Sequence, residues 1–264
     1  MTPVLILGAG RLGGALIDGW SRFGGPAGPD LLILDPAPSE AALSAGRVGA
    51  VLSPGPAELA RAGTVVLSVK PQVWREVAAT VSHNLAPDAV IVSVAAGVRA
   101  SDISAAFGGR RVARVMPTTA VAVGRGVASL FAEDPEAARR AADLFRPVAT
   151  VVALAEEDLL HAATGVSGSA PAYFYAFVEA LEAAGVAAGL PDDAARNLAR
   201  ATMIGAAALL DATGEEPAEL RRQVTSPKGT TEAALEVLMG EGGLGPLLEV
   251  AVAAAARRSR ELGG

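Results

Sequence analysis

The chain has 264 residues, of which 51% are hydrophobic, and its formal net charge is -6. This length suits one large domain or two of ordinary size, and so apolar a chain buries a substantial core. The acidic balance and the lack of a basic tract argue against a nucleic-acid partner. With no cysteine and only two histidines, disulfides, thiolate catalysis and zinc sites built on cysteine are excluded, and we expect no metal.

The N-terminal region does not resemble a secretory signal. Its apolar run, residues 4–7, is short and leads into glycine-rich turn chemistry. No uninterrupted apolar stretch reaches the length of a membrane span, even around residues 251–256. We therefore expect a cytoplasmic protein with no membrane partner.

The first half of the chain alternates short apolar runs with helical patterns. Strands are predicted at residues 4–7, 31–34, 48–51, 64–69, 89–94, 111–116, 127–131 and 148–154. Helices are predicted at residues 12–23, 39–45, 73–85, 101–107 and 135–145. This alternation is typical of βαβ units, so we expect an α/β Rossmann domain with a doubly wound, mostly parallel sheet.

The strand pattern stops after about Ala155. Helices are predicted at residues 156–164, 171–188, 192–212, 217–224, 230–239 and 244–262. Glycines stand where helix ends are expected, at Gly165, Gly189, Gly214 and Gly240. We therefore expect a Rossmann domain over residues 1–154 and an all-α domain over residues 155–264.

The helical half is rich in alanine and has long apolar faces, for example along Ala201, Ile204, Ala208 and Leu209. Small residues let helices approach closely, and a single small bundle would leave part of this surface exposed. The pattern favours a homodimer built through this half of the chain. The alternative is a bundle that packs only against its own Rossmann domain.

A glycine-rich motif, Gly8-Ala9-Gly10-Arg11-Leu12-Gly13, follows the first predicted strand and opens a helical pattern. In this arrangement the first glycine permits a tight turn, the second lets a pyrophosphate approach, and the third lets the helix lie close to the sheet. Asp35 ends the second predicted strand, where a carboxylate accepts hydrogen bonds from ribose hydroxyls. Together these features predict a bound dinucleotide whose pyrophosphate rests on the helix N-terminus.

Three later loops follow predicted strands and should line the same cofactor crevice. They contain Val69-Lys70-Pro71, Ala95-Ala96-Gly97 and Met116-Pro117. Lys70 either touches the phosphates or ribose or is a solvated loop lysine. The other two loops are expected near the nicotinamide of NAD(P)H.

Asp35 also bears on which cofactor is preferred. Its carboxylate would repel the 2′-phosphate of NADPH, and no arginine directly follows it to relieve that repulsion. We therefore expect NADH to be favoured. A cation from another part of the chain, such as Arg11 in the glycine-rich turn, would oppose this preference if it captured the phosphate.

Two stretches combine a serine turn, a proline and a helical pattern: Ser167-Gly168-Ser169-Ala170-Pro171-Ala172-Tyr173 and Ser226-Pro227-Lys228-Gly229-Thr230-Thr231. Serine is a good N-cap, and proline is tolerated just inside a helix. A helix start offers free amides at the positive end of the dipole, which suits a small anion such as a carboxylate. The alternative is that both are ordinary capped helix starts.

A general acid is hard to find in this sequence. His161 lies mid-helix and is interpreted as a packed or capping histidine, and His83 as an exposed residue near a helix end. Glu179 and Glu182 are interpreted as solvated or dimer-contact residues. The chemistry should therefore need little proton transfer from protein side chains.

The motifs together resemble the pyrroline-5-carboxylate reductase family in order along the whole chain. The resemblance rests on the glycine-rich motif, Val69-Lys70-Pro71, Ser93-Val94-Ala95-Ala96-Gly97-Val98, Arg114-Val115-Met116-Pro117, Thr164 to Tyr173, and Ser226 to Thr231. The two serine–proline motifs are its specific part.

The resemblance implies hydride transfer from NAD(P)H to the C5=N imine of 1-pyrroline-5-carboxylate, which gives L-proline. It implies a helical domain that binds this small-molecule substrate and interlocks as a dimer, with assembly into larger rings in some members. Substrate-binding positions carry over to Ser226, Gly229, Thr230 and Thr231, with the substrate carboxylate on the backbone of the last three. Thr231 is the implied catalytic position, bonded to the ring nitrogen.

The chain departs from the family pattern at Thr118, where asparagine is frequent, and at Lys228, where glycine is common. A lysine at this second position is strained if the backbone has positive φ. Rival functions are another imine reductase, a β-hydroxyacid dehydrogenase, or a non-enzymatic redox sensor. The hydroxyacid dehydrogenase would need a lysine on the helix after Ser169, and residues 169–188 contain none.

Overall fold

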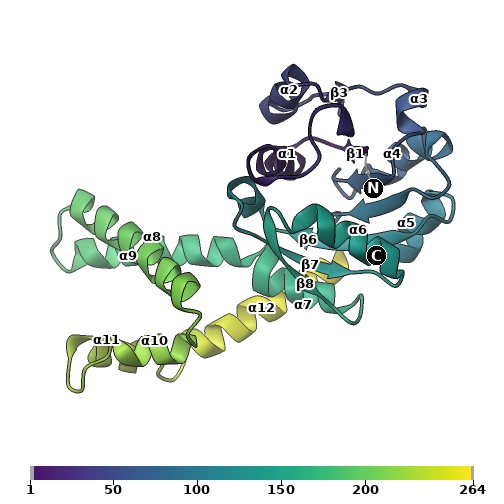
Figure 1. The fold of residues 1–264 in the computed structure, drawn as a ribbon. Helices are drawn as coiled ribbons and strands as arrows, with labels where there is room; N and C mark the ends of the chain where they lie inside the picture. The colour runs from purple at the N-terminus through teal and green to yellow at the C-terminus, as the bar shows by residue number, and fades with distance from the viewer. Residues whose placement is uncertain (1–2, 263–264) are drawn as a thin grey trace. The chain divides into compact units, whose positions relative to one another are not determined.

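The computed structural model describes residues 3–262, which form two compact units (Figure 1). The first unit runs to Gly168 and takes up the chain again from Ala254 onward, and the second is Ser169–Ala253. The boundary expected after residue 154 coincides with the end of the last strand. The compact units divide later, and the end of the chain belongs to the first unit, which no local sequence feature indicated.

The first unit is built on one eight-stranded sheet with the order β3-β2-β1-β4-β5-β6-β7-β8. The strands are β1 Val4–Leu7, β2 Leu31–Leu34, β3 Val51–Leu52, β4 Thr64–Leu67, β5 Val90–Ser93, β6 Val112–Pro117, β7 Gly126–Phe131 and β8 Ala149–Ala153. The six strands from β1 to β6 are all parallel to one another, β7 is antiparallel to β6, and β8 is parallel to β7. The mostly parallel, doubly wound sheet is thus confirmed.

One predicted strand is largely wrong. Residues 48–51 were expected to be extended, but β3 begins only at Val51. The amides of Val48 and Ala50 both donate to the carbonyl of Ala45, so these residues form the turn that ends the preceding helix. Turn hydrogen bonds therefore override the apolar pattern there.

Helices cover both faces of the sheet. They are α1 Arg11–Phe23, α2 Glu40–Arg47, α3 Pro56–Leu59, α4 Trp74–Val81, α5 Ala100–Ala106 and α6 Pro135–Phe145, with 3-10 turns at Gly28–Asp30, Ser82–Asn84 and Thr119–Val123. One apolar cluster contains Leu16, Trp20 and Phe145, and a separate one contains Trp74 and Phe107. The two clusters form the two layers of core expected on either side of a parallel sheet.

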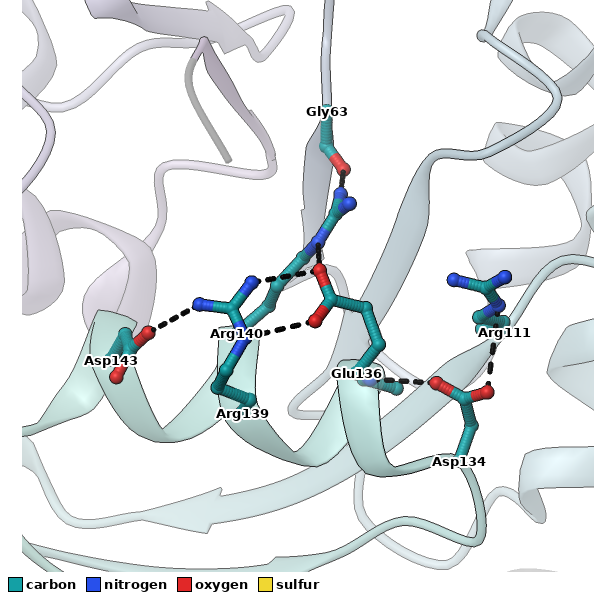
Figure 2. Close-up of polar contacts among 8 residues, drawn as sticks. Gly63, Arg111, Asp134, Glu136, Arg139, Arg140 and Asp143 are labelled. Carbon is teal, nitrogen blue, oxygen red and sulfur yellow. Dashed lines mark hydrogen bonds and ion pairs between the residues drawn. The ribbon is translucent and has the colours of Figure 1, made fainter.

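Helix α6 is tied down by a network of ion pairs (Figure 2). Glu136 accepts hydrogen bonds from Arg139, at 2.8 Å, and from Arg140, at 2.7 Å. Arg140 also donates to the carbonyl of Gly63 at 2.6 Å. The network therefore joins the helix to the loop before β4.

The chain leaves the first unit through a π-helical turn. Helix α7 (Leu159–Ala163) runs into this turn (η4, Thr164–Gly168) and then into α8 (Ala170–Ala187). The hydroxyls of Thr164 and Ser167 donate back to the carbonyls four residues earlier, at 2.7 and 2.8 Å. Ser169 has a helical backbone and makes no side-chain cap. The helix end expected at Gly165 is therefore wrong, because the chain continues there as a π turn. The helix start predicted at Pro171 is confirmed to within one residue, but no serine side chain caps it.

The second unit consists of α8, α9 Asp192–Thr213, α10 Pro217–Gln223, α11 Thr230–Leu238 and the first part of α12 Leu244–Glu261. The predicted ends at Gly189 and Gly214 are confirmed by positive φ values of 102° and 63°. Residues 169–253 are all described, and only Ala195 and Ala199 among them are buried. Large apolar side chains are exposed along this unit, including Tyr175, Ile204 and Val237.

Across residues 3–262, no helix is both long and apolar enough to span a membrane.

Candidate functional site

The glycine-rich turn has the close contacts that a G-x-G-x-x-G motif requires. Gly8 has φ 92°, and a Cβ on it would lie 2.8 Å from the carbonyl oxygen of Ser68. A Cβ on Gly13 would lie 2.1 Å from the carbonyl oxygen of Gly8, so α1 packs directly on the turn. Gly10 is different, because a Cβ there would meet nothing within 4 Å. The space in front of Gly10 is therefore open for a ligand at the N-terminus of α1.

Asp35 lies directly after β2, as the sequence predicts, and is tied to the glycine-rich turn. Its Oδ2 accepts a hydrogen bond from the amide of Ala9 at 2.5 Å, and its Oδ1 accepts one from the amide of Ala37 at 2.7 Å. Each carboxylate oxygen has a second lone-pair direction that can accept a further hydrogen bond. The carboxylate therefore shapes the turn and can still serve a ribose.

The predicted cofactor loops follow strands that end at the same edge of the sheet. Leu7, Leu67, Ser93 and Arg114 are level with one another across β1, β4, β5 and β6. Lys70 in the loop after β4 is exposed, and Ala95 and Gly97 in the loop after β5 are buried. Met116 and Pro117 do not form a loop as predicted: they are the last two residues of β6 and pair with β7. The sheet thus brings two loops, the end of β6 and the glycine-rich turn to one carboxyl edge, where ligands of such sheets bind.

Thr118 has a structural role that explains the departure from the family pattern. Its hydroxyl accepts a hydrogen bond from the amide of Val127 at 3.1 Å, and its amide donates to the carbonyl of Val127 at 2.9 Å. The side chain is 7% exposed. Thr118 therefore extends the pairing of β6 with β7.

The second serine–proline motif does open a helix, as predicted. Gly229 is the N-cap of α11 in an extended conformation, and a Cβ on it would lie 2.9 Å from the carbonyl oxygen of Ser226. Within residues 3–262, the hydroxyl of Thr231 has no hydrogen-bond partner. Free amides and an unpaired hydroxyl are therefore presented together at the start of the helix.

Lys228 has φ 59°, in the left-handed region where the Cβ of a non-glycine residue is unfavourable. Its amide donates to Oε2 of Glu232 at 2.6 Å, so a carboxylate from the first turn of α11 bonds back to the turn before the helix. The backbone strain expected for a lysine with positive φ is therefore present at this position.

The histidines are placed as the sequence indicates. His161 is 8% exposed, and its Nδ1 is 3.0 Å from Oγ of Ser259. Burial, followed by the nearby charges of Arg114 and Arg260, lowers the pKa of His161. His83 is exposed. His161 is thus a packed, neutral histidine, and its partner at Ser259 was not predictable because 98 residues separate the two.

The sequence reasoning missed one buried polar group. Arg114 is 4% exposed and pairs with Glu157 at 2.9 Å. The Arg114-Val115-Met116-Pro117 motif was noted only as part of a family resemblance. A charged residue inside an otherwise apolar strand is the signal that points to a buried partner.

The turn, the acid after β2 and the crossover beside β1 define the first unit as a Rossmann dinucleotide-binding domain, which the chain joins to a helical unit. Residues 3–97 match a family model described as "NADP oxidoreductase coenzyme F420-dependent". Residues 157–262 match one described as "Pyrroline-5-carboxylate reductase dimerisation".

Full-length relatives agree with these matches. The pyrroline-5-carboxylate reductases of Pisum sativum and Pseudomonas aeruginosa are each 38% identical to this chain, over 97% and 99% of its length and 94% and 97% of theirs. The solved structure of a pyrroline-5-carboxylate reductase from Coxiella burnetii superposes with a TM-score of 0.90, at 29% identity, over 100% of this chain and 99% of that one. The chain belongs to the pyrroline-5-carboxylate reductase family, whose members are NAD(P)-dependent oxidoreductases.

Proposed function

We propose that the chain reduces 1-pyrroline-5-carboxylate to L-proline, the last step of proline biosynthesis. Bound NAD(P)H would supply a hydride to C5 of the imine; the C=N π electrons would then move to nitrogen, which would take a proton. The observation that carries the proposal is that a dinucleotide-binding turn and a helix start with a free hydroxyl occur in one chain of this family.

Cofactor binding is assigned to the carboxyl edge of the sheet. Gly10, Arg11 and Leu12 open α1, whose N-terminal amides suit a pyrophosphate, while Gly8 and Gly13 keep the turn compact. The remaining proposed contacts are the ribose contact at Asp35 and the residues Val69, Lys70, Pro71, Ala95, Ala96, Gly97, Met116 and Pro117.

Substrate binding is assigned to the start of α11. The free amides of Thr230 and Thr231 suit the substrate carboxylate. The amide of Gly229, which the family resemblance also implies, donates to the carbonyl of Ser226 at 3.0 Å and would have to exchange this bond to take part. The hydroxyl of Thr231 is the group for the ring nitrogen. No protein acid is required, because the imine takes its proton from solvent.

We also propose that NADH is the favoured cofactor. The carboxylate of Asp35 is held in place by two amides, at 2.5 and 2.7 Å, so it is not free to turn away from the ribose. A 2′-phosphate at that position would face this negative charge at short range.

We further propose a homodimer through residues 155–264, the segment that contains the dimerisation match, with a larger ring as a further level of assembly. The exposed apolar side chains of α8, α9 and α12 support it, since such surface is normally covered. Light scattering should give at least twice the chain mass at micromolar concentration. A monomer would refute the dimer.

The test of function is to mix the protein with NADH or NADPH and 1-pyrroline-5-carboxylate and to follow the absorbance of the reduced cofactor. Imine-dependent oxidation of the cofactor is expected, with proline as the product. A β-hydroxyacid dehydrogenase would instead reduce the oxidised cofactor in the presence of a hydroxyacid, and a redox sensor would bind the cofactor without turnover. Either result would replace the proposal.

A further inference from the structure

Glu157 joins three segments of the first unit. Its Oε1 accepts hydrogen bonds from Arg114 in β6, at 2.9 Å, and from the amide of Ala100 at the start of α5, at 2.7 Å. Its Oε2 lies 3.5 Å from Arg99. Glu157 itself belongs to the connection between β8 and α7. One carboxylate therefore links β6, α5 and the segment that leads toward the helical unit.

The carboxylate acts as the cap of α5. Arg99, the N-cap residue, makes no side-chain cap hydrogen bond, and the amide of Ala100 has no acceptor within the helix. Glu157 supplies that acceptor from 57 residues away. A negative charge at a helix N-terminus is also favourable with the helix dipole.

This contact lies beside the nicotinamide side of the cofactor crevice. Arg114 is level with Ser93, the last residue of β5, and the loop Ala95-Ala96-Gly97 runs from there to Arg99 and Ala100. The loop therefore has one end held by β5 and the other end held by Glu157. Gly97 has φ 79°, a conformation that glycine adopts without strain and that lets the loop turn between these two ends.

We propose that Glu157 is a positioning residue for the cofactor: it fixes the loop after β5 by accepting the amide of Ala100, and Arg114 holds its carboxylate in place. The inference rests on the proposed function, which assigns this loop to the nicotinamide. Both residues act through the loop, so the effect is on how well the loop is pre-organised for binding. Loss of the acceptor at Ala100 should therefore weaken binding of the cofactor and leave binding of the imine nearly unchanged.

The test compares two double variants that both remove the buried charges, since a lone buried charge would itself destabilise the fold. Arg114→Met with Glu157→Gln keeps a neutral oxygen for the amide of Ala100, whereas Arg114→Met with Glu157→Leu does not. The Leu variant is expected to raise the KM and the directly measured Kd for the reduced cofactor about tenfold, as for one positioned hydrogen bond. The Gln variant should restore most of that loss. Asp158→Asn, which alters the exposed pair with Arg99 but leaves Glu157, Arg114 and the amide of Ala100 in place, is the control and should match wild type in cofactor affinity.

A second pair of variants tests the proposal if either double variant does not fold. Ala100→Pro removes the donor itself at the first position of α5, where proline is tolerated, and Ala100→Ser keeps the donor. The proline variant should reproduce the loss of cofactor affinity, and the serine variant should not. Equal cofactor affinity within each pair, or a fall in kcat with unchanged affinity, would overturn the proposal. Cofactor binding is measured directly and does not depend on turnover. A protein without the proposed activity can therefore still show whether Glu157 positions the loop for the cofactor.

Discussion

The carboxylate of Asp35 accepts a hydrogen bond from the amide of Ala9, with 2.5 Å between Oδ2 and nitrogen. The end of β2 is thereby bonded to the middle of the glycine-rich turn after β1. The residue that should read the adenosine ribose therefore also holds the loop that receives the pyrophosphate. The proposed ribose contact and the shape of the turn thus depend on the same side chain.

Substitution of Asp35 separates these two effects. Asp35→Asn removes the charge but keeps one acceptor oxygen for the turn, and Asp35→Ser removes both. The ratio of kcat/KM for NADH to that for NADPH should fall in both variants, because the repulsion of the 2′-phosphate is lost. Both variants should lose stability, because each loses at least one of the two amide hydrogen bonds, and the serine variant should lose about 1 kcal/mol more. Asp30→Ser, at the other end of β2, is the control for the ratio, and a wild type that prefers NADPH would contradict the assignment.

Gly13 and Gly10 should respond differently to alanine. Gly13→Ala places a Cβ 2.1 Å from the carbonyl of Gly8, so it should lower the free energy of unfolding by about 1–3 kcal/mol and weaken cofactor binding. Gly10→Ala meets no protein atom within 4 Å, so it should be stable but should raise the KM for the cofactor by about tenfold. Urea denaturation measures the change in stability, and cofactor titration measures the change in affinity. Normal cofactor affinity in Gly10→Ala would show that the pyrophosphate does not bind at Gly10.

Thr231→Ala should reduce turnover by about tenfold to a hundredfold, as for one positioned hydrogen bond of roughly 1.5–3 kcal/mol. Its hydroxyl has no partner among residues 3–262, so the loss of stability should be modest. Thr213→Ala is the matched control, because that hydroxyl bonds the carbonyl of Leu209 in the same unit. Unchanged kcat and KM in Thr231→Ala would exclude the residue from the reaction.

Lys228→Gly should stabilise the protein by up to about 1 kcal/mol. The residue has φ 59°, a left-handed conformation in which a Cβ is costly, although glycine also gains freedom in the unfolded chain. Lys228→Ala keeps the Cβ and should bring no such gain. Urea denaturation of the two variants measures the difference, and equal stability would show that backbone strain is not the cause.

Glu136 should make stability depend on acidity. Hydrogen bonds from Arg139 and Arg140 lower the pKa of this carboxyl from 4.5 to about 2. Because the folded-state pKa is depressed, the stabilisation is complete above the unfolded value and is lost as the pH falls through the folded one. Glu136→Gln should therefore lower the Tm at neutral pH, with a difference from wild type that shrinks between pH 4.5 and about 2. Glu133→Gln, an exposed neighbour, should show no such trend.

Much of the fold was readable from local patterns. Apolar runs predicted seven strands close to their observed positions, and α6 was predicted at its observed bounds, because Asp134 caps it and Pro135 opens it. The failures have local causes too. At Val48 a turn replaced a strand, and at Gly165 the helix continued as a π turn because the hydroxyls of Thr164 and Ser167 bond back to its carbonyls.

By itself, the sequence determined the α/β class, the glycine-rich turn, the helix start at Thr230 and the family, because period, turn chemistry and motif spacing act over a few residues. Only the tertiary structure decided that Asp35 bonds Ala9, that Glu157 caps α5, and that the end of α12 returns to the first unit. These contacts join residues tens of positions apart. Which residues form these contacts depends on the segments that the folded sheet brings together, and local sequence patterns carry no information about that.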